Sequence, residues 1–148
     1  GIIKDGAKMI NAVTNSAVPH ITVNMAASFG AGNYGMSGRA YDPRFMFAWA
    51  NAKLAVMGAQ QLAGVMSIVG KQSAEAAGRE FDAAADEKRR AQIEAQIERE
   101  SDAFFVSARL YDDGVIDPRD TRSVLGMALS AAHSGTVEGR RGFGVFRM

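Results

Sequence analysis

The stretch from Ser28 to Met36, SFGAGNYGM, constrains the fold of this chain more than any other. Its three glycines directly follow the apolar run from Ile21 to Ala27, which predicts a buried strand. Because glycine has no Cβ, the backbone N–H groups of such a stretch can approach a ligand closely. N–H groups fixed around one point stabilise a developing oxyanion. We therefore expect backbone amides, rather than side chains, to carry any chemistry that this chain performs.

A second strand-to-helix transition follows at Val56-Met57-Gly58-Ala59. N–H groups at the start of a helix have no partner within the helix and favour negative charge. Two adjacent transitions could direct their amides at one point. Two ordinary strand-to-helix turns give the same pattern, and the spacing alone favours that simpler interpretation.

The spacing Gly30-x-Gly32-x-x-Gly35 also matches a dinucleotide-binding fingerprint. That fingerprint requires a sustained helix directly after the glycines, and Gly38 and Pro43 interrupt one here. We therefore reject a nucleotide site of this type.

Hydrophobic periodicity predicts alternating helices and strands. The expected helices cover residues 3–17, 59–69, 81–100 and about 118–133, and the expected strands cover 20–26, 45–49 and 53–57. Asp117-Pro118-Arg119-Asp120 is a strong helix start, with Asp at the N-cap and Pro at the first helical position. Residues 71–80 are expected to form a polar connection.

Composition excludes several classes of function. A length of 148 residues is sufficient for one domain with a hydrophobic core, and a net charge of +1 gives no reason to expect nucleic acid or an anionic membrane as a partner. The sequence shows no apolar run of transmembrane length and no signal peptide. It has no cysteine, and neither His20 nor His133 has a recognisable nucleophile partner or belongs to a metal-ligand cluster.

Ordered motifs along nearly the whole chain resemble the C-terminal half of the carboxyltransferase β subunit of biotin-dependent acyl-CoA carboxylases. The matching stretches are residues 1–9, 28–36, 38–41, 55–58, 112–118 and 144–148. The wording Asn33-Tyr34-Gly35-Met36 and the ending Phe146-Arg147-Met148 resemble the 3-methylcrotonyl-CoA branch more than the acetyl- or propionyl-CoA branches. Geranyl-CoA carboxylase is a close neighbour.

This resemblance implies an α/β fold of the crotonase (ClpP/crotonase) type, with β-sheet layers surrounded by helices. Residues 1–148 would form the C-terminal carboxyltransferase domain, with an N-terminal crotonase-like domain preceding Gly1. The implied activity belongs to a ligase that moves CO2 from carboxybiotin to an acyl-CoA such as 3-methylcrotonyl-CoA in leucine degradation. The implied location is the cytoplasm of a bacterium or the mitochondrial matrix of a eukaryote.

The resemblance also implies partners and a site. Biotin would be carried covalently by a biotin carboxylase/biotin carrier α subunit, the β subunits would form a hexamer, and this domain would hold no metal. The backbone amides of Ala31 and Gly32 would form the oxyanion hole that stabilises the biotin enolate, without a side-chain base. The implied biotin-binding residues are Phe29, Gly30, Ala31, Gly32, Asn33 and Tyr34, with Met57 and Gly58 added by analogy to the crotonase fold.

Two other interpretations stay open. A stand-alone crotonase-type acyl-CoA hydratase or isomerase would need a catalytic Glu or Asp near the glycines, and none lies between Asp5 and Asp42. A non-catalytic oligomerisation module would fit the many glycines and alanines, but it would give Gly30 to Gly35 no role.

Overall fold

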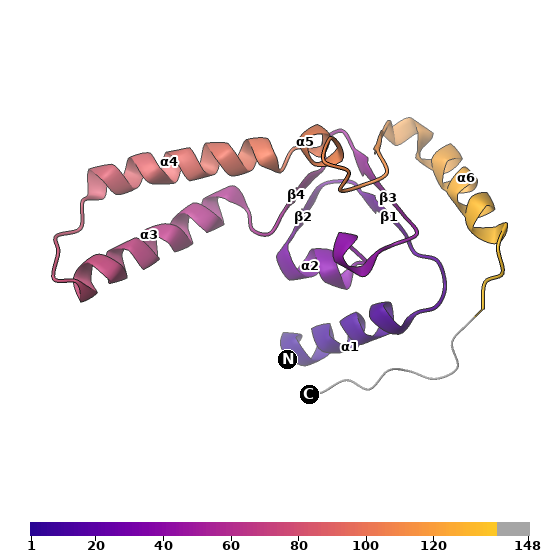
Figure 1. Cartoon of the computed structure of the whole chain (residues 1–148), viewed down its shortest axis with the longest axis horizontal. Helices are drawn as coiled ribbons and strands as arrows, with labels where there is room; N and C mark the ends of the chain where they lie inside the picture. The colour runs from indigo at the N-terminus through magenta and orange to yellow at the C-terminus, as the bar shows by residue number, and fades with distance from the viewer. Residues whose placement is uncertain (139–148) are drawn as a thin grey trace.

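The computed structural model describes residues 1–138 and contains two small parallel sheets (Figure 1). One sheet has three strands in the order β1 (Ile21–Asn24), β3 (Phe45–Trp49) and β5 (Val115–Ile116). The other pairs β2 (Ala27–Phe29) with β4 (Lys53–Ala55). Because every pair is parallel, the carboxyl ends of paired strands lie at the same edge of their sheet. The motif at 144–148 lies outside the described residues.

The same two chain segments are neighbours in both sheets. β1 continues into β2 after two residues, and β3 continues into β4 after three. Ile21 pairs with Phe45 in the first sheet, and Ala27 pairs with Lys53 in the second. The strand expected over 20–26 is confirmed as β1, which ends at Asn24, and after a bend a second short strand, β2, lies beyond the predicted range.

Alanines fill the core at this bend. Ala48, Ala52 and Ala103 are almost fully buried and contact one another, and Leu54 and Val115 pack against them. Side chains this small allow the two sheets and the following helix to approach closely.

The helices surround the sheets and extend beyond them (Figure 1). The α-helices are α1 (Ile2–Asn15), α2 (Gly30–Gly35), α3 (Ala59–Ala76), α4 (Ala83–Glu100), α5 (Ala103–Ser107) and α6 (Thr121–His133), and the 3-10 turns are η1 (Arg39–Tyr41) and η2 (Pro118–Asp120). The prediction over 81–100 is confirmed within two residues. The polar connection expected over 71–80 is wrong, because Lys71 to Ala76 continue α3. These residues are polar but mostly good helix formers. The helix ends at Ala76, two residues before Gly78, which has a φ of 65°.

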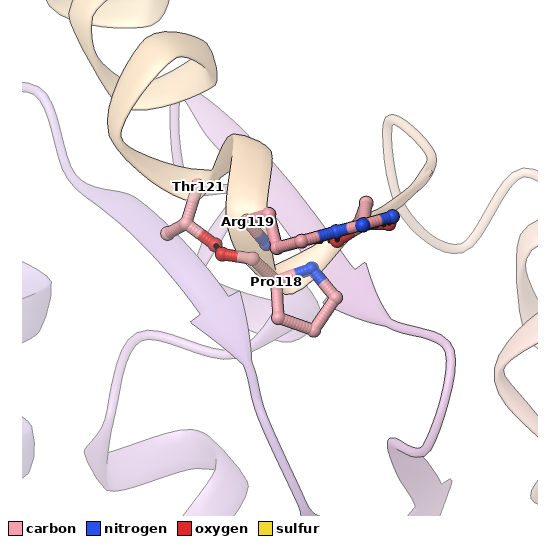
Figure 2. A network of polar contacts seen from close by, with 4 residues as sticks. Pro118, Arg119 and Thr121 are labelled. Atoms are coloured by element: carbon pink, nitrogen blue, oxygen red, sulfur yellow. Dashed lines mark hydrogen bonds and ion pairs between the residues drawn. The ribbon is translucent and has the colours of Figure 1, made fainter.

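The predicted helix start at Asp117 is confirmed, although one 3-10 turn precedes α6. Asp117 Oδ1 accepts a hydrogen bond of 2.8 Å from the Arg119 amide, and the Arg119 guanidinium holds the pKa of this carboxyl below its usual value. Figure 2 shows Thr121 turned back toward Pro118, whose carbonyl accepts a 2.8 Å hydrogen bond from the Thr121 hydroxyl. Trp49 Nε1 donates to the same hydroxyl at 3.0 Å, which ties the end of β3 to the start of α6.

Helices α3 and α4 pack mainly against each other as an antiparallel hairpin that extends away from the sheets (Figure 1). A Cβ at Gly70 would lie 2.5 Å from Arg89 Nη2, so the helices approach closely at this point. α4 is solvated around most of its circumference, and Asp86 is its one buried residue.

Asp86 fixes this hairpin. Its carboxylate is 7% exposed, accepts a hydrogen bond from the Ser67 hydroxyl across the pair, and forms an ion pair with Arg89 one turn along α4. The hydrogen bond from Ser67, followed by the contact with Arg89, lowers the pKa of Asp86. The charge therefore stays on this carboxyl at neutral pH although it is shielded from water.

The described residues bury little large apolar surface. The buried apolar residues are Met46, Val106 and six alanines, and none of the described large side chains is fully buried. Ile3 at the start of α1 is 86% exposed, and α1 has no buried residue. Val65, Ile68 and Val69 on α3 are also exposed. The core formed by the described residues is therefore small and consists mostly of alanine.

Within residues 1–138, the helices are all too short or too polar to cross a bilayer.

We expect Asp86→Asn to reduce amide protection in α3 and α4 at pH 7. The folded-state pKa of Asp86 is lowered from 3.8, so its charge stabilises the hairpin above that pH and ceases to do so as the pH falls through the lower folded value. The difference between wild type and variant should therefore shrink below about pH 4. Hydrogen exchange of the full-length protein at matched pH measures this, with the exposed neighbour substitution Glu87→Gln as control. Equal protection of Asp86→Asn and wild type at pH 7 would contradict the assignment.

Candidate functional site

The glycine-rich stretch begins a helix and is not a loop. β2 ends at Phe29, and α2 starts at the next residue, Gly30, which has a φ of 58°. A Cβ at Gly30 would lie 3.2 Å from the carbonyl oxygen of Val56, the residue after β4. Both the backbone angle and this close approach favour glycine here. Gly32, by contrast, has neither a positive φ nor an atom within 4 Å of its Cβ position.

No side chain caps the first backbone amides of α2. Phe29 occupies the N-cap and makes no side-chain cap hydrogen bond. The first N–H groups of a helix have no acceptor in the preceding turn. Ala31 and Gly32 are both exposed, so their amides can meet an external acceptor.

The second glycine transition lies beside the first. Phe29 pairs with Ala55 in the parallel ladder, so β2 and β4 end at the same edge. Gly58 is the N-cap of α3 and also lacks a side-chain cap, and its Cβ position would be 3.7 Å from the Phe29 ring. The structure thus brings together the two helix starts that the sequence singled out, and their positive ends add at this edge.

Two predicted binding residues make contacts inside the chain. Asn33 Nδ2 donates to Ser28 Oγ at 2.8 Å, and its carbonyl oxygen accepts a 2.8 Å hydrogen bond from the Gly38 amide. The ring of Tyr34 lies 5.8 Å from that of Tyr41. Asn33 therefore fixes α2 against β2, and any contact of Asn33 or Tyr34 with biotin stays a prediction.

A mostly apolar cleft of about 220 Å³ adjoins the start of α2. Gly30 and Val56 lie on its wall, and Met46, Leu54 and Val106 provide apolar surface. Its polar lining includes Arg39, Glu100 and Tyr111, none of which the sequence had assigned to a site. Arg39 and Tyr111 lie 72 positions apart, so no local pattern could have joined them.

The two histidines and the possible metal ligands show no arrangement suited to chemistry in the described residues. His20 Nδ1 is 2.9 Å from Ser37 Oγ, and His133 is exposed at the end of α6. Residues 1–138 contain no group of three or more His, Asp or Glu side chains suited to a metal ion. Among the described residues, Glu100 is the one carboxylate that lines the cleft. It accepts a 3.0 Å hydrogen bond from Gln96.

Parallel strands that each lead through glycine into a helix at one edge define an α/β protein. The chain belongs to the carboxyl transferase domain family, whose model matches residues 1–145. It is 62% identical to the probable biotin-dependent acyl-coenzyme A carboxylase beta2 subunit of Mycobacterium tuberculosis and 47% identical to the biotin-dependent 3-methylcrotonyl-coenzyme A carboxylase beta1 subunit of the same organism. Each match covers all of this chain and 28% of the relative.

Solved structures agree. The beta subunit of P. aeruginosa geranyl-CoA carboxylase superimposes with a TM-score of 0.81 at 40% identity, covering 98% of this chain and 27% of that one. Transcarboxylase 12S, described as a hexamer and a multienzyme core, gives a TM-score of 0.76 at 29% identity over all of this chain and 27% of its own. The predicted family and crotonase-like fold are confirmed, and the chain spans little more than a quarter of the length of these relatives.

We expect Gly38→Ala to destabilise the site, because the added Cβ would lie 1.8 Å from Asn33 Oδ1 and 2.5 Å from the Asn33 carbonyl oxygen. The cost should be about 1–3 kcal/mol, as for other overpacked positions. Gly126→Ala, within α6 and with no atom near its Cβ position, is the matched control and should be neutral or stabilising by up to about 1 kcal/mol. Denaturant unfolding of the full-length protein measures both, and equal stability of the two variants would contradict this packing.

Proposed function

We propose that this chain is the biotin-side part of a carboxyltransferase β subunit, which moves CO2 from carboxybiotin to an acyl-CoA. The observation that carries the proposal is the pair of adjacent helix starts at Gly30 and Gly58 beside an apolar cleft, in a chain of the carboxyl transferase family. Biotin-dependent relatives that match the whole chain support the same conclusion.

The residues fit biotin at this edge. Biotin combines a polar ureido group with an apolar sulfur-containing ring, and the site combines uncapped amides with an apolar cleft. Phe29 lies next to Gly58, and Met57 borders an adjoining hollow together with Leu62 and Phe105. We assign Phe29, Gly30, Asn33, Tyr34, Met57 and Gly58 to the surroundings of the bound biotin.

The amides of Ala31 and Gly32 are the proposed catalytic groups. Carboxybiotin supplies a carboxyl group activated on a ureido nitrogen, from which it passes to an acyl-CoA carbon while a proton moves the opposite way. With biotin bound, the two amides would donate to its ureido oxygen and would stabilise the negative charge left there when the carboxyl group departs. Donors fixed in the backbone stabilise this charge without reorganising. No side-chain base of this chain takes part.

The proposed acyl-CoA is 3-methylcrotonyl-CoA, which would place the enzyme in leucine degradation. The relative at 47% identity is named for that substrate, whereas the structure with a TM-score of 0.81 is named for geranyl-CoA. The crotonase-type hydratase or isomerase remains the second candidate, because Glu100 on the cleft wall is a carboxylate of the kind it would need. Substitution of Glu100 separates the two candidates.

We also propose that residues 1–148 are the second of two crotonase-like domains and assemble as a β-subunit hexamer with biotin-bearing α subunits. The exposed apolar side chains on α1, α3 and α6 support burial against another domain. We place the complex in the bacterial cytoplasm or, in a eukaryote, the mitochondrial matrix; the matching beta chains of Drosophila melanogaster and Arabidopsis thaliana are mitochondrial by name.

We expect Gly32→Val in the full complex to slow carboxyl transfer by about 10²–10³-fold, the scale for losing one oxyanion donor. The Cβ position of Gly32 is free of protein atoms, so the variant should fold normally while filling the approach to the amides. Biotin carboxylation, assayed separately, should be unchanged.

His20→Ala, His133→Ala and Glu100→Gln are the controls and should each leave transfer within about fivefold of wild type. Wild-type transfer by an assembled Gly32→Val enzyme would refute the oxyanion assignment. Hydration or isomerisation of an enoyl-CoA by the wild-type enzyme, with loss of that activity in Glu100→Gln, would favour the hydratase-like interpretation.

We expect the isolated chain 1–148 to self-associate in sedimentation velocity experiments, because its apolar helix faces lack their neighbours. The full-length β subunit should sediment as a discrete oligomer. The upstream coding sequence should encode a second crotonase-like domain. A dispersed monomer of the isolated chain at high concentration, or a stop codon directly before Gly1, would count against the two-domain assembly.

A further inference from the structure

The turn after α5 holds a leucine in a conformation that usually selects glycine. Leu110 has a φ of 57° and is 82% exposed. The Leu110 amide donates to the Ser107 carbonyl at 2.9 Å, and the Tyr111 amide donates to the Val106 carbonyl at 3.3 Å. This pairing is a Schellman motif, whose left-handed position is normally glycine. A strained residue that gains no packing of its own calls for a functional explanation.

Arg39, from the 3-10 turn η1, contacts this turn. Its Nη1 donates to the Leu110 carbonyl at 2.7 Å, and its guanidinium lies 4.2 Å from the centre of the Tyr111 ring. A guanidinium over an aromatic face attracts the ring electrostatically. One side chain therefore fixes both the carbonyl of the strained residue and the aromatic ring that follows it.

Both members of this contact line the cleft that begins at Gly30. Arg39 and Tyr111 contribute to its wall together with Gly30, Val56 and Leu54. The cleft thus runs from Gly30, the first residue of α2, and the end of β4 to Tyr111, and Ala31 and Gly32 follow Gly30 directly in the chain. Movement of the turn would change the width of the cleft without touching the amides.

We propose that Tyr111 is the wall against which the apolar ring of biotin packs, and that Arg39 is a positioning residue that holds Tyr111 there. This inference rests on the proposed function, because it assigns the cleft to biotin. In this arrangement the sulfur-containing ring lies between Tyr111 and the apolar surface of Leu54 and Val106, with the ureido oxygen directed toward Ala31 and Gly32. Tyr111 and Arg39 determine how well biotin is held, while the amides determine how fast it reacts.

The test is equilibrium binding of free biotin to the full-length β subunit without its α partner, followed by saturation-transfer NMR. Tyr111→Ala and Arg39→Met should each weaken biotin binding about tenfold, and the double variant should be no weaker than the worse single variant, because the two side chains act through one contact. Tyr111→Phe keeps the ring and should bind biotin within about twofold of wild type. In the assembled enzyme the KM for the biotin carrier should rise by a similar factor, with the KM for the acyl-CoA unchanged.

Two matched controls separate this role from general disruption. Arg44→Met removes a guanidinium 5.5 Å from the Phe45 ring and outside the cleft, and Phe104→Ala removes an exposed ring on α5. Both should bind biotin normally. If Tyr111→Ala does not fold, Tyr111→Leu replaces it.

Wild-type biotin binding by Tyr111→Ala and Arg39→Met, or equal weakening by the control variants, would overturn the inference. If transfer is slow in Gly32→Val but Tyr111→Ala binds biotin normally, only this inference fails. If Gly32→Val transfers normally, the proposed function fails as well.

Discussion

The parallel pairing of β2 with β4 is the interaction on which the rest of the site depends. This ladder joins only three residues on each strand, yet it places Phe29 beside Ala55 and so fixes where both following helices begin. Its register determines which amides lie at the common edge, because a shift by one residue would reverse the facing of every side chain in the strand. Gly30 makes the register possible, since a larger residue would meet the Val56 carbonyl.

The features that sequence reasoning located were those carried by neighbouring residues. The glycine stretch, the second transition at Gly58 and the cap at Asp117 all follow from local backbone chemistry, and the structure contains each of them. The strand β2 escaped detection because its three residues, Ala27–Phe29, are too few to show a period of their own before the glycines begin. The contact between Arg39 and Tyr111 escaped it because it joins segments that only the completed fold brings together.

The fold also shows how an amide site can be supported by very small side chains. Ala48, Ala52 and Ala103 contribute little hydrophobic free energy individually, but they allow the bend, both sheets and α5 to meet at close range. Such a core fixes geometry more than it provides stability. The large apolar side chains lie instead on outward faces, which is the distribution expected of a domain that completes its core against a neighbour.

The α3–α4 hairpin has a consequence for the order of folding. It lies between β4 and α5 in the chain. The residues on either side of it meet where the Leu54 amide donates to the Ser101 carbonyl at 2.9 Å and where Lys53 and Asp102 form an isolated antiparallel β-bridge. Without the hairpin, these residues would have to close a long flexible loop against its entropy. Two helices linked by a short connection make mostly local contacts and form quickly. A hairpin formed early would present residues 101–103 to β4 almost in place and would reduce the entropic cost of the long-range pairing of β3 with β5.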